Sequence, residues 1–148
     1  MRAACPECGC ALSEETSCQE IFESFLALEF SSPAYGEVHM LTVACFMTQH
    51  GRYSDAALAW ISENLRAHLQ EGLTPAQIRQ QIAQNPAQAR RDWRITRAPD
   101  EARQAHIAWS MSIGDVALNY QDAASYRAQI RQWAATVLAD MQPLLANR

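Results

Sequence analysis

Apolar residues recur every three or four positions along most of the chain, which is the spacing of an amphipathic helix, whereas the alternation typical of strands is weak. The first stripe follows Ser17 and Glu20, which have the spacing of a helix-capping box. We expect the second helix to start at Ser32-Pro33 and to end at Gly51. The two stripes are Ile21, Phe22, Phe25 and Leu26, and then Val38, Leu41, Thr42, Cys45 and Phe46.

Three further helices are predicted downstream. One follows Ser54 and stops at Gly72, a short one follows Thr74-Pro75 and is broken by Asn85-Pro86, and a long one starts at about Asp122. Their inward positions are Leu58, Ile61, Leu65 and Leu69, then Ile78 and Ile82, and finally Tyr126, Ile130, Trp133, Val137, Met141 and Leu144.

The intervening stretch from 86 to 120 is expected to be broken helix and loop, with a turn at Ser112-Ile113-Gly114-Asp115. The pattern as a whole predicts an all-α bundle of about four or five mostly antiparallel helices. We expect a single domain over residues 1–148, with an N-terminal segment at 1–17 and the bundle at 18–148.

Composition narrows the class of protein. Hydrophobic residues make up 49% of the 148 residues and charged residues 19%, which is a globular balance. The apolar runs are too short to span a membrane, and no secretory signal opens the chain, so we expect a cytoplasmic protein. All 12 basic residues are arginine, which excludes Schiff-base chemistry and a P-loop lysine from this chain.

The motif Cys5-Pro6-Glu7-Cys8-Gly9 is typical of a zinc knuckle, because two cysteines at this spacing can place both thiolates on one tetrahedral ion. The proline fixes one φ angle, and the glycine permits the left-handed turn that closes the loop. Three alternatives are a redox pair of the glutaredoxin kind, a disulfide pairing and a disordered tail. A redox pair normally follows a strand, and none is predicted here; five cysteines in a reducing compartment disfavour disulfides.

Two more ligands are needed, and helix geometry ranks the candidates, which are Cys10, Cys18, His39, Cys45 and His50. If the first two helices are antiparallel with a short turn near Ser31, equal rise per residue puts Cys18 beside His50, whereas His39 falls near Ala27, several turns away. The predicted zinc ligands are therefore Cys5, Cys8, Cys18 and His50. Cys45 is expected to be a small buried hydrophobic residue, and Cys10 a spare, exposed thiol.

These motifs resemble those of an uncharacterised bacterial domain family of unknown function. The family's N-terminal Cys-Pro-x-Cys-Gly is followed by a cysteine that opens a helix, and by a His-x-Leu-Thr-Val…Gln-His segment that matches positions 39–50 here. His68-Leu69, Asp115-Val116 and Trp133-Ala134 match further pairs. The chain departs from the pattern at Ala44, Phe46 and Gly51, where the family has aspartate, tyrosine and proline. The resemblance implies a fold and a metal site, but no activity.

Two classes of function are compatible with these features. The first is a non-catalytic, zinc-stabilised module that binds an unknown protein or a small-molecule ligand, since four protein ligands leave no position for water. The second is a metal- or histidine-dependent enzyme similar to the DinB-like helical bundles. The same antiparallel count pairs His39 with His68, and His106 and Asp115 could join them in a second site. Alternatively, each histidine is a hydrogen-bonded core residue.

Nucleic-acid binding is not expected. From Ala3 to Gly51 the chain holds seven glutamates and no arginine, and the net charge is -4. The arginines between Arg90 and Arg103 are interleaved with acids, so we read them as a solvated face. We predict no useful affinity for DNA or RNA oligonucleotides near physiological salt. Salt-sensitive micromolar binding in a fluorescence anisotropy titration would contradict this.

Overall fold

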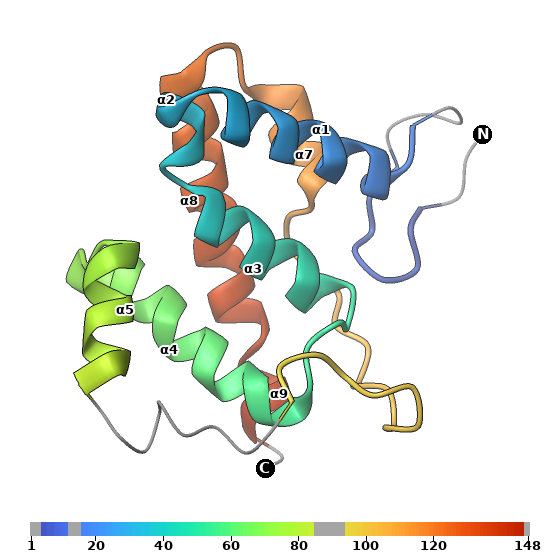
Figure 1. Ribbon diagram of the computed structural model, residues 1–148. Helices are drawn as coiled ribbons and strands as arrows, with labels where there is room; N and C mark the ends of the chain where they lie inside the picture. The colour runs from blue at the N-terminus through green and yellow to red at the C-terminus, as the bar shows by residue number, and fades with distance from the viewer. Residues whose placement is uncertain (1–3, 12–15, 85–93, 147–148) are drawn as a thin grey trace.

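The computed structural model describes residues 4–11, 16–84 and 94–146. Within these ranges most residues are helical (Figure 1). The β-type pairing among the described residues is an isolated antiparallel bridge between Tyr53 and Thr96. The all-α prediction is confirmed. The helices are α1 (Cys18–Ser31), α2 (Pro33–Gly36), α3 (His39–Gln49), α4 (Asp55–Glu71), α5 (Pro75–Gln84), α7 (Ile113–Asn119), α8 (Ala123–Asp140) and α9 (Gln142–Ala146). In the part of the chain described here, none of them is long and apolar enough to cross a bilayer.

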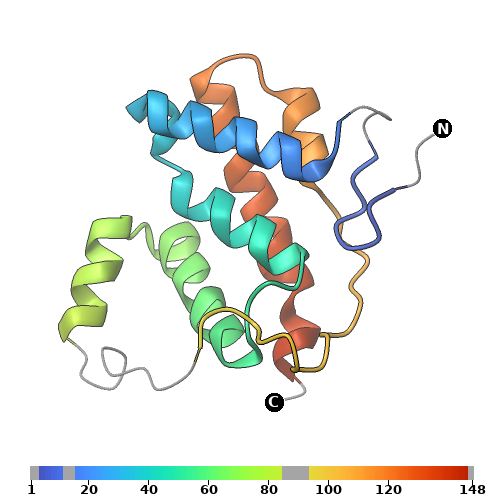
Figure 2. The ribbon, with the colours of Figure 1, turned by 45° about the vertical axis from the view of Figure 1, so that its right-hand side comes forward.

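Helix α8 is the centre of the bundle. It packs against α2, α3, α4, α7 and α9, and both ribbon views show it running behind α3 (Figures 1 and 2). Five of the six positions predicted to face inward on the last helix are fully buried, and the sixth, Leu144, falls in α9 and is half-buried. The five are Tyr126, Ile130, Trp133, Val137 and Met141. The stripe read from the sequence is therefore the core of the molecule.

Local capping signals fix most helix ends where the sequence predicts them. Ser17 and Ser54 accept hydrogen bonds from the amides of Glu20 and Ala57, each at 3.1 Å, at the starts of α1 and α4. Gly72 ends α4 with a left-handed φ of 73°. These contacts need only neighbouring residues, which is why the pattern alone locates them.

The prediction of one continuous second helix is wrong, because the chain forms two helices there, α2 and α3. The backbone of Gly36 lies so close to α1 that an added Cβ would be 2.5 Å from the carbonyl oxygen of Glu29. The chain then turns through Glu37 and Val38 before α3 begins. Since α1 and α3 run in roughly opposite directions, the N-terminus of α1 and the C-terminus of α3 lie on the same side of the molecule (Figures 1 and 2).

The expected turn at 112–115 is also wrong, because it is the start of α7. The Ser112 hydroxyl accepts from the Gly114 amide at 3.2 Å, and the Asp115 carboxylate accepts from the Ser112 amide at 2.8 Å. Together these contacts make a capping box. Residues 94–112 are loop, as predicted. The predicted break at Asn85-Pro86 and the arginines Arg90 and Arg91 lie outside the described residues.

We predict that Gly36→Ala lowers the free energy of unfolding by about 2 kcal/mol or more, because the new methyl group overlaps the α1 backbone. Urea denaturation measures the change. Gly72→Ala is the control: it introduces left-handed strain of about 1 kcal/mol, but its Cβ meets no atom within 4 Å. Equal losses for the two variants would show that Gly36 is not needed for the close approach.

Candidate metal centre

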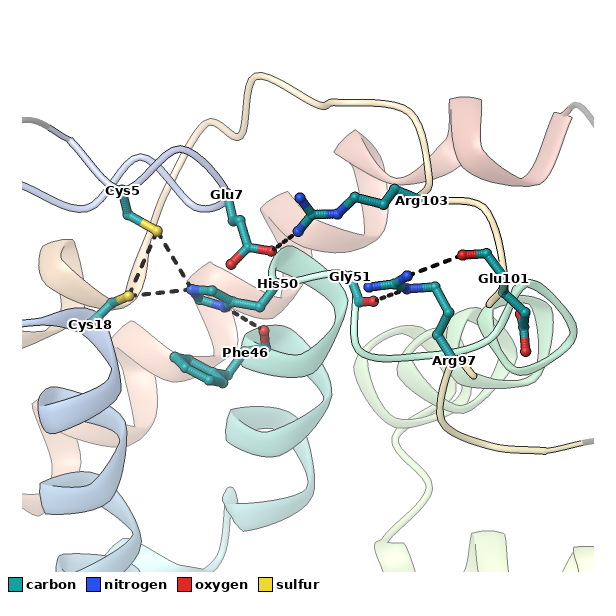
Figure 3. A network of polar contacts seen from close by, with 9 residues as sticks. All are labelled: Cys5, Glu7, Cys18, Phe46, His50, Gly51, Arg97, Glu101 and Arg103. Atoms are coloured by element: carbon teal, nitrogen blue, oxygen red, sulfur yellow. Dashed lines mark hydrogen bonds and ion pairs between the residues drawn. The ribbon is translucent and has the colours of Figure 1, made fainter. Parts of the chain in front are cut away.

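Cys5, Cys8, Cys18 and His50 bring four potential ligand atoms within 4.8 Å of one another. The residues come from three parts of the chain: the loop at 4–11, the first residue of α1 and the residue that caps the C-terminus of α3. Figure 3 shows Cys5 and Cys18 facing the His50 ring from two different segments. These four residues therefore lie close enough to hold a metal ion.

The loop folds back on itself through backbone hydrogen bonds. The Gly9 amide donates to the Cys5 carbonyl at 2.9 Å, and the Cys5 amide donates to the Cys10 carbonyl at 2.8 Å. Gly9 adopts a φ of 84°, which a residue with a side chain adopts only with strain. Burial acts to raise the pKa of the Cys5 thiol, but hydrogen bonds from the amides of Cys8 and Glu7 outweigh it and lower that pKa. Amide donors of this kind stabilise a thiolate.

His50 is oriented by the helix that carries it. Its Nδ1 donates to the Phe46 carbonyl at 2.8 Å, one turn earlier in α3, which leaves Nε2 facing the sulfur atoms (Figure 3). The ring stacks on Phe46 with centroids 4.0 Å apart, and Phe46 stacks in turn on Phe22 at 4.0 Å. Burial lowers the pKa of His50, so the imidazole is neutral at pH 7 and can serve as a metal ligand.

The distances among Cys5, Cys18 and His50 have the scale of a tetrahedral site. The Sγ atoms of Cys5 and Cys18 are 3.8 Å apart, and His50 Nε2 lies 3.9 Å from the first and 3.3 Å from the second. Zinc bonds of about 2.3 Å to sulfur and about 2.0–2.1 Å to nitrogen, at tetrahedral angles, require about 3.8 Å between sulfurs and about 3.6 Å between sulfur and nitrogen. Small adjustments of the His50 ring would equalise its two contacts.

The other two cysteines lie outside this group. Cys45 is completely buried in the core, and burial raises the pKa of its thiol, as expected of a small hydrophobic residue. Cys10 is also buried, so the expectation that it is exposed is wrong. It is not part of the group of four candidate ligands.

The loop that follows residue 94 contacts the end of the molecule where the four candidate ligands lie, a contact that the sequence did not indicate. Arg103 forms an ion pair with Glu7 at 3.0 Å, and Arg97 donates from Nε to the Gly51 carbonyl at 2.9 Å (Figure 3). Arg97 also reaches the Glu101 carbonyl at 3.3 Å. Of the described arginines in the basic cluster, Arg97 is half-buried against the turn after His50. Arg103 is 75% exposed and pairs with Glu7 at the surface, in agreement with the predicted solvated face.

The predicted second site does not form as a group. His39 contacts the Glu29 carboxylate through Nδ1 at 2.7 Å, whereas His68 contacts the Leu73 carbonyl at 2.7 Å. Asp115 caps α7, and His106 is exposed on the loop. Within the described residues, none of these four side chains belongs to a group of three or more potential metal ligands. His39 and His68 therefore have different hydrogen-bond partners.

Glu29 is the polar residue that sequence reasoning missed. Its side chain is completely buried, and its second carboxylate oxygen accepts hydrogen bonds from the hydroxyls of Thr42 and Tyr126. Burial, and then the bond to Glu29, raise the pKa of Tyr126, so its phenol remains a donor. The three-residue spacing of His39 and Thr42 indicates that they share one face of α3. The contact with Tyr126 joins residues 97 positions apart, so no local pattern indicates it.

We predict that Tyr126→Phe lowers the free energy of unfolding by about 2 kcal/mol, because it removes one hydrogen bond to a buried carboxylate. Chemical denaturation of the variant measures this. Tyr35→Phe is the matched control, since that ring packs on Tyr126 at 5.0 Å but leaves the Glu29 contacts intact. A loss no greater than that of the control would show that Glu29 does not depend on the phenol.

Comparison with known proteins adds a family but no activity. The model of a family described as a family of unknown function (DUF5946) matches residues 3–142. No curated protein and no solved structure matches the chain.

Proposed function

We propose that this chain, which belongs to the DUF5946 family of unknown function, is a non-catalytic module in which one zinc ion fixes the N-terminal loop to the helical bundle. The ligands in this proposal are Cys5, Cys8, Cys18 and His50. The observation that carries it is the mutual approach of their four ligand atoms within 4.8 Å. Residues 1–17 and 18–148 then act as one domain, because the ion joins them.

The donor set favours zinc over other common ions. Three thiolates and one imidazole are soft or borderline ligands, which suit zinc and disfavour calcium and magnesium. Sulfur–sulfur and sulfur–nitrogen distances near those of a tetrahedral zinc site support the same choice. The Phe46 carbonyl supplies the outer contact that zinc-bound histidines usually make through their second nitrogen.

A structural role follows from the number of ligands. Catalytic zinc sites keep one position for water or substrate, whereas four protein ligands fill the tetrahedron. The proposed site ties positions 5, 18 and 50, so binding free energy would contribute to folding.

The enzyme alternative built on His39 and His68 gains no support, since the two imidazoles have different partners. None of the five cysteines forms a disulfide in the structure, as suits a metal-binding protein of the reducing cytoplasm, which is where we place it.

We predict that protein purified without added metal carries about one zinc ion per chain, and that a Cys5→Ser, Cys8→Ser double variant carries almost none. Serine hydroxyls are far weaker zinc ligands than thiolates. Elemental analysis by plasma mass spectrometry measures the content. Loss of the ion should also lower the midpoint of thermal unfolding, and re-addition of zinc to the chelator-treated wild type should restore it.

Two further measurements separate the possible outcomes. Cys45→Ala removes a buried thiol outside the group and should retain its zinc; zinc retained by the double variant would falsify the ligand assignment. Cobalt substituted for zinc should give the visible spectrum of a tetrahedral thiolate site, unchanged by added azide. A spectrum that shifts with azide would reveal an open coordination position and contradict the structural role.

A further inference from the structure

We propose that a second site, a cavity between α3, α4 and α5, binds a small and mostly apolar carboxylic acid. The cavity has a volume of about 370 Å³, near the lower end of the range found for ligand pockets. Its walls are mainly aliphatic and aromatic. They include Val43, Trp60, Ile61, Leu65, Ile78 and Ile82. A wall of this composition suits a hydrocarbon chain or ring.

The polar part of the cavity is held in a fixed orientation. His39 lines it, and its Nδ1 is bound at 2.7 Å by Glu29, whose side chain is completely buried. Glu29 is in turn held by the hydroxyls of Thr42 and Tyr126 on two other helices. With Nδ1 engaged, the ring presents Nε2 as its remaining polar atom. A rigid imidazole of this kind loses little entropy when it binds a ligand.

The charge of the lining selects the ligand group. Arg79, Asn64 and His39 are among the polar side chains that line the cavity, and none of the described lining residues is acidic. A carboxylate would therefore meet one cation among the lining residues, the guanidinium of Arg79, and no acidic residue among them. An alcohol of the same length carries no charge and would gain less from this guanidinium.

Octanoate is the probe, and 1-octanol is its uncharged counterpart. We expect octanoate to bind saturably at one site per chain, measured by calorimetry on the metal-loaded protein, and to shift the amide resonances of α3, α4 and α5. Octanol should bind at least tenfold more weakly. Arg79→Gln should weaken octanoate binding at least tenfold while leaving the zinc content unchanged.

Arg66→Gln is the matched control, because Arg66 is an exposed arginine on α4 that does not line this cavity. Its affinity for octanoate should stay within twofold of that of the wild type. Because Arg79 is exposed, Arg79→Gln should fold as the wild type does. Equal affinity for octanoate and octanol, no saturable binding, shifts confined to other helices, or unchanged affinity in Arg79→Gln would each overturn the proposal.

Discussion

The carboxylate of Glu29 joins three helices from a position inside the protein. It binds His39 and Thr42 on α3 and Tyr126 on α8, and it lies near the C-terminal end of α1. A buried carboxylate is costly unless every oxygen is satisfied, so this contact tolerates little sliding of α1 along α3. The alignment that it favours places the N-terminus of α1 beside the C-terminus of α3, where Cys18 meets His50. Both proposed sites depend on this one alignment.

Aromatic packing carries the same alignment along the helices. Phe22 of α1 lies flat on Phe46 of α3, and Phe46 lies on the His50 ring. The imidazole is thus supported on one face by the core, while the Phe46 carbonyl fixes its rotation. A ligand held in this way is already oriented before an ion arrives, which reduces the ordering that binding requires. The knuckle loop contributes the more adjustable half of the site.

Much of this arrangement could be predicted from the sequence, because it rests on local signals and on simple counting. The caps at Ser17 and Ser54 act within one turn, and equal rise along two antiparallel helices was enough to pair Cys18 with His50. The break at Gly36 could not be predicted in this way, since it arises from the approach of a different helix. The Glu29 cluster was missed for a related reason: one of its partners is 97 residues away. The count that pairs His39 with His68 takes no account of their hydrogen-bond partners, which are Glu29 and the Leu73 carbonyl.

The position of the metal ligands along the chain also bears on biosynthesis. All four precede residue 51, whereas the Tyr126 that completes the Glu29 cluster lies in the last quarter of the chain. A ribosome releases the N-terminal segments first, and the loops that close between positions 5, 18 and 50 are short. All four proposed ligands are therefore available to an ion before α8 is made. Metal capture at that stage would bring the N-terminus of α1 to the C-terminus of α3, and the Glu29 cluster would complete the alignment once Tyr126 emerges.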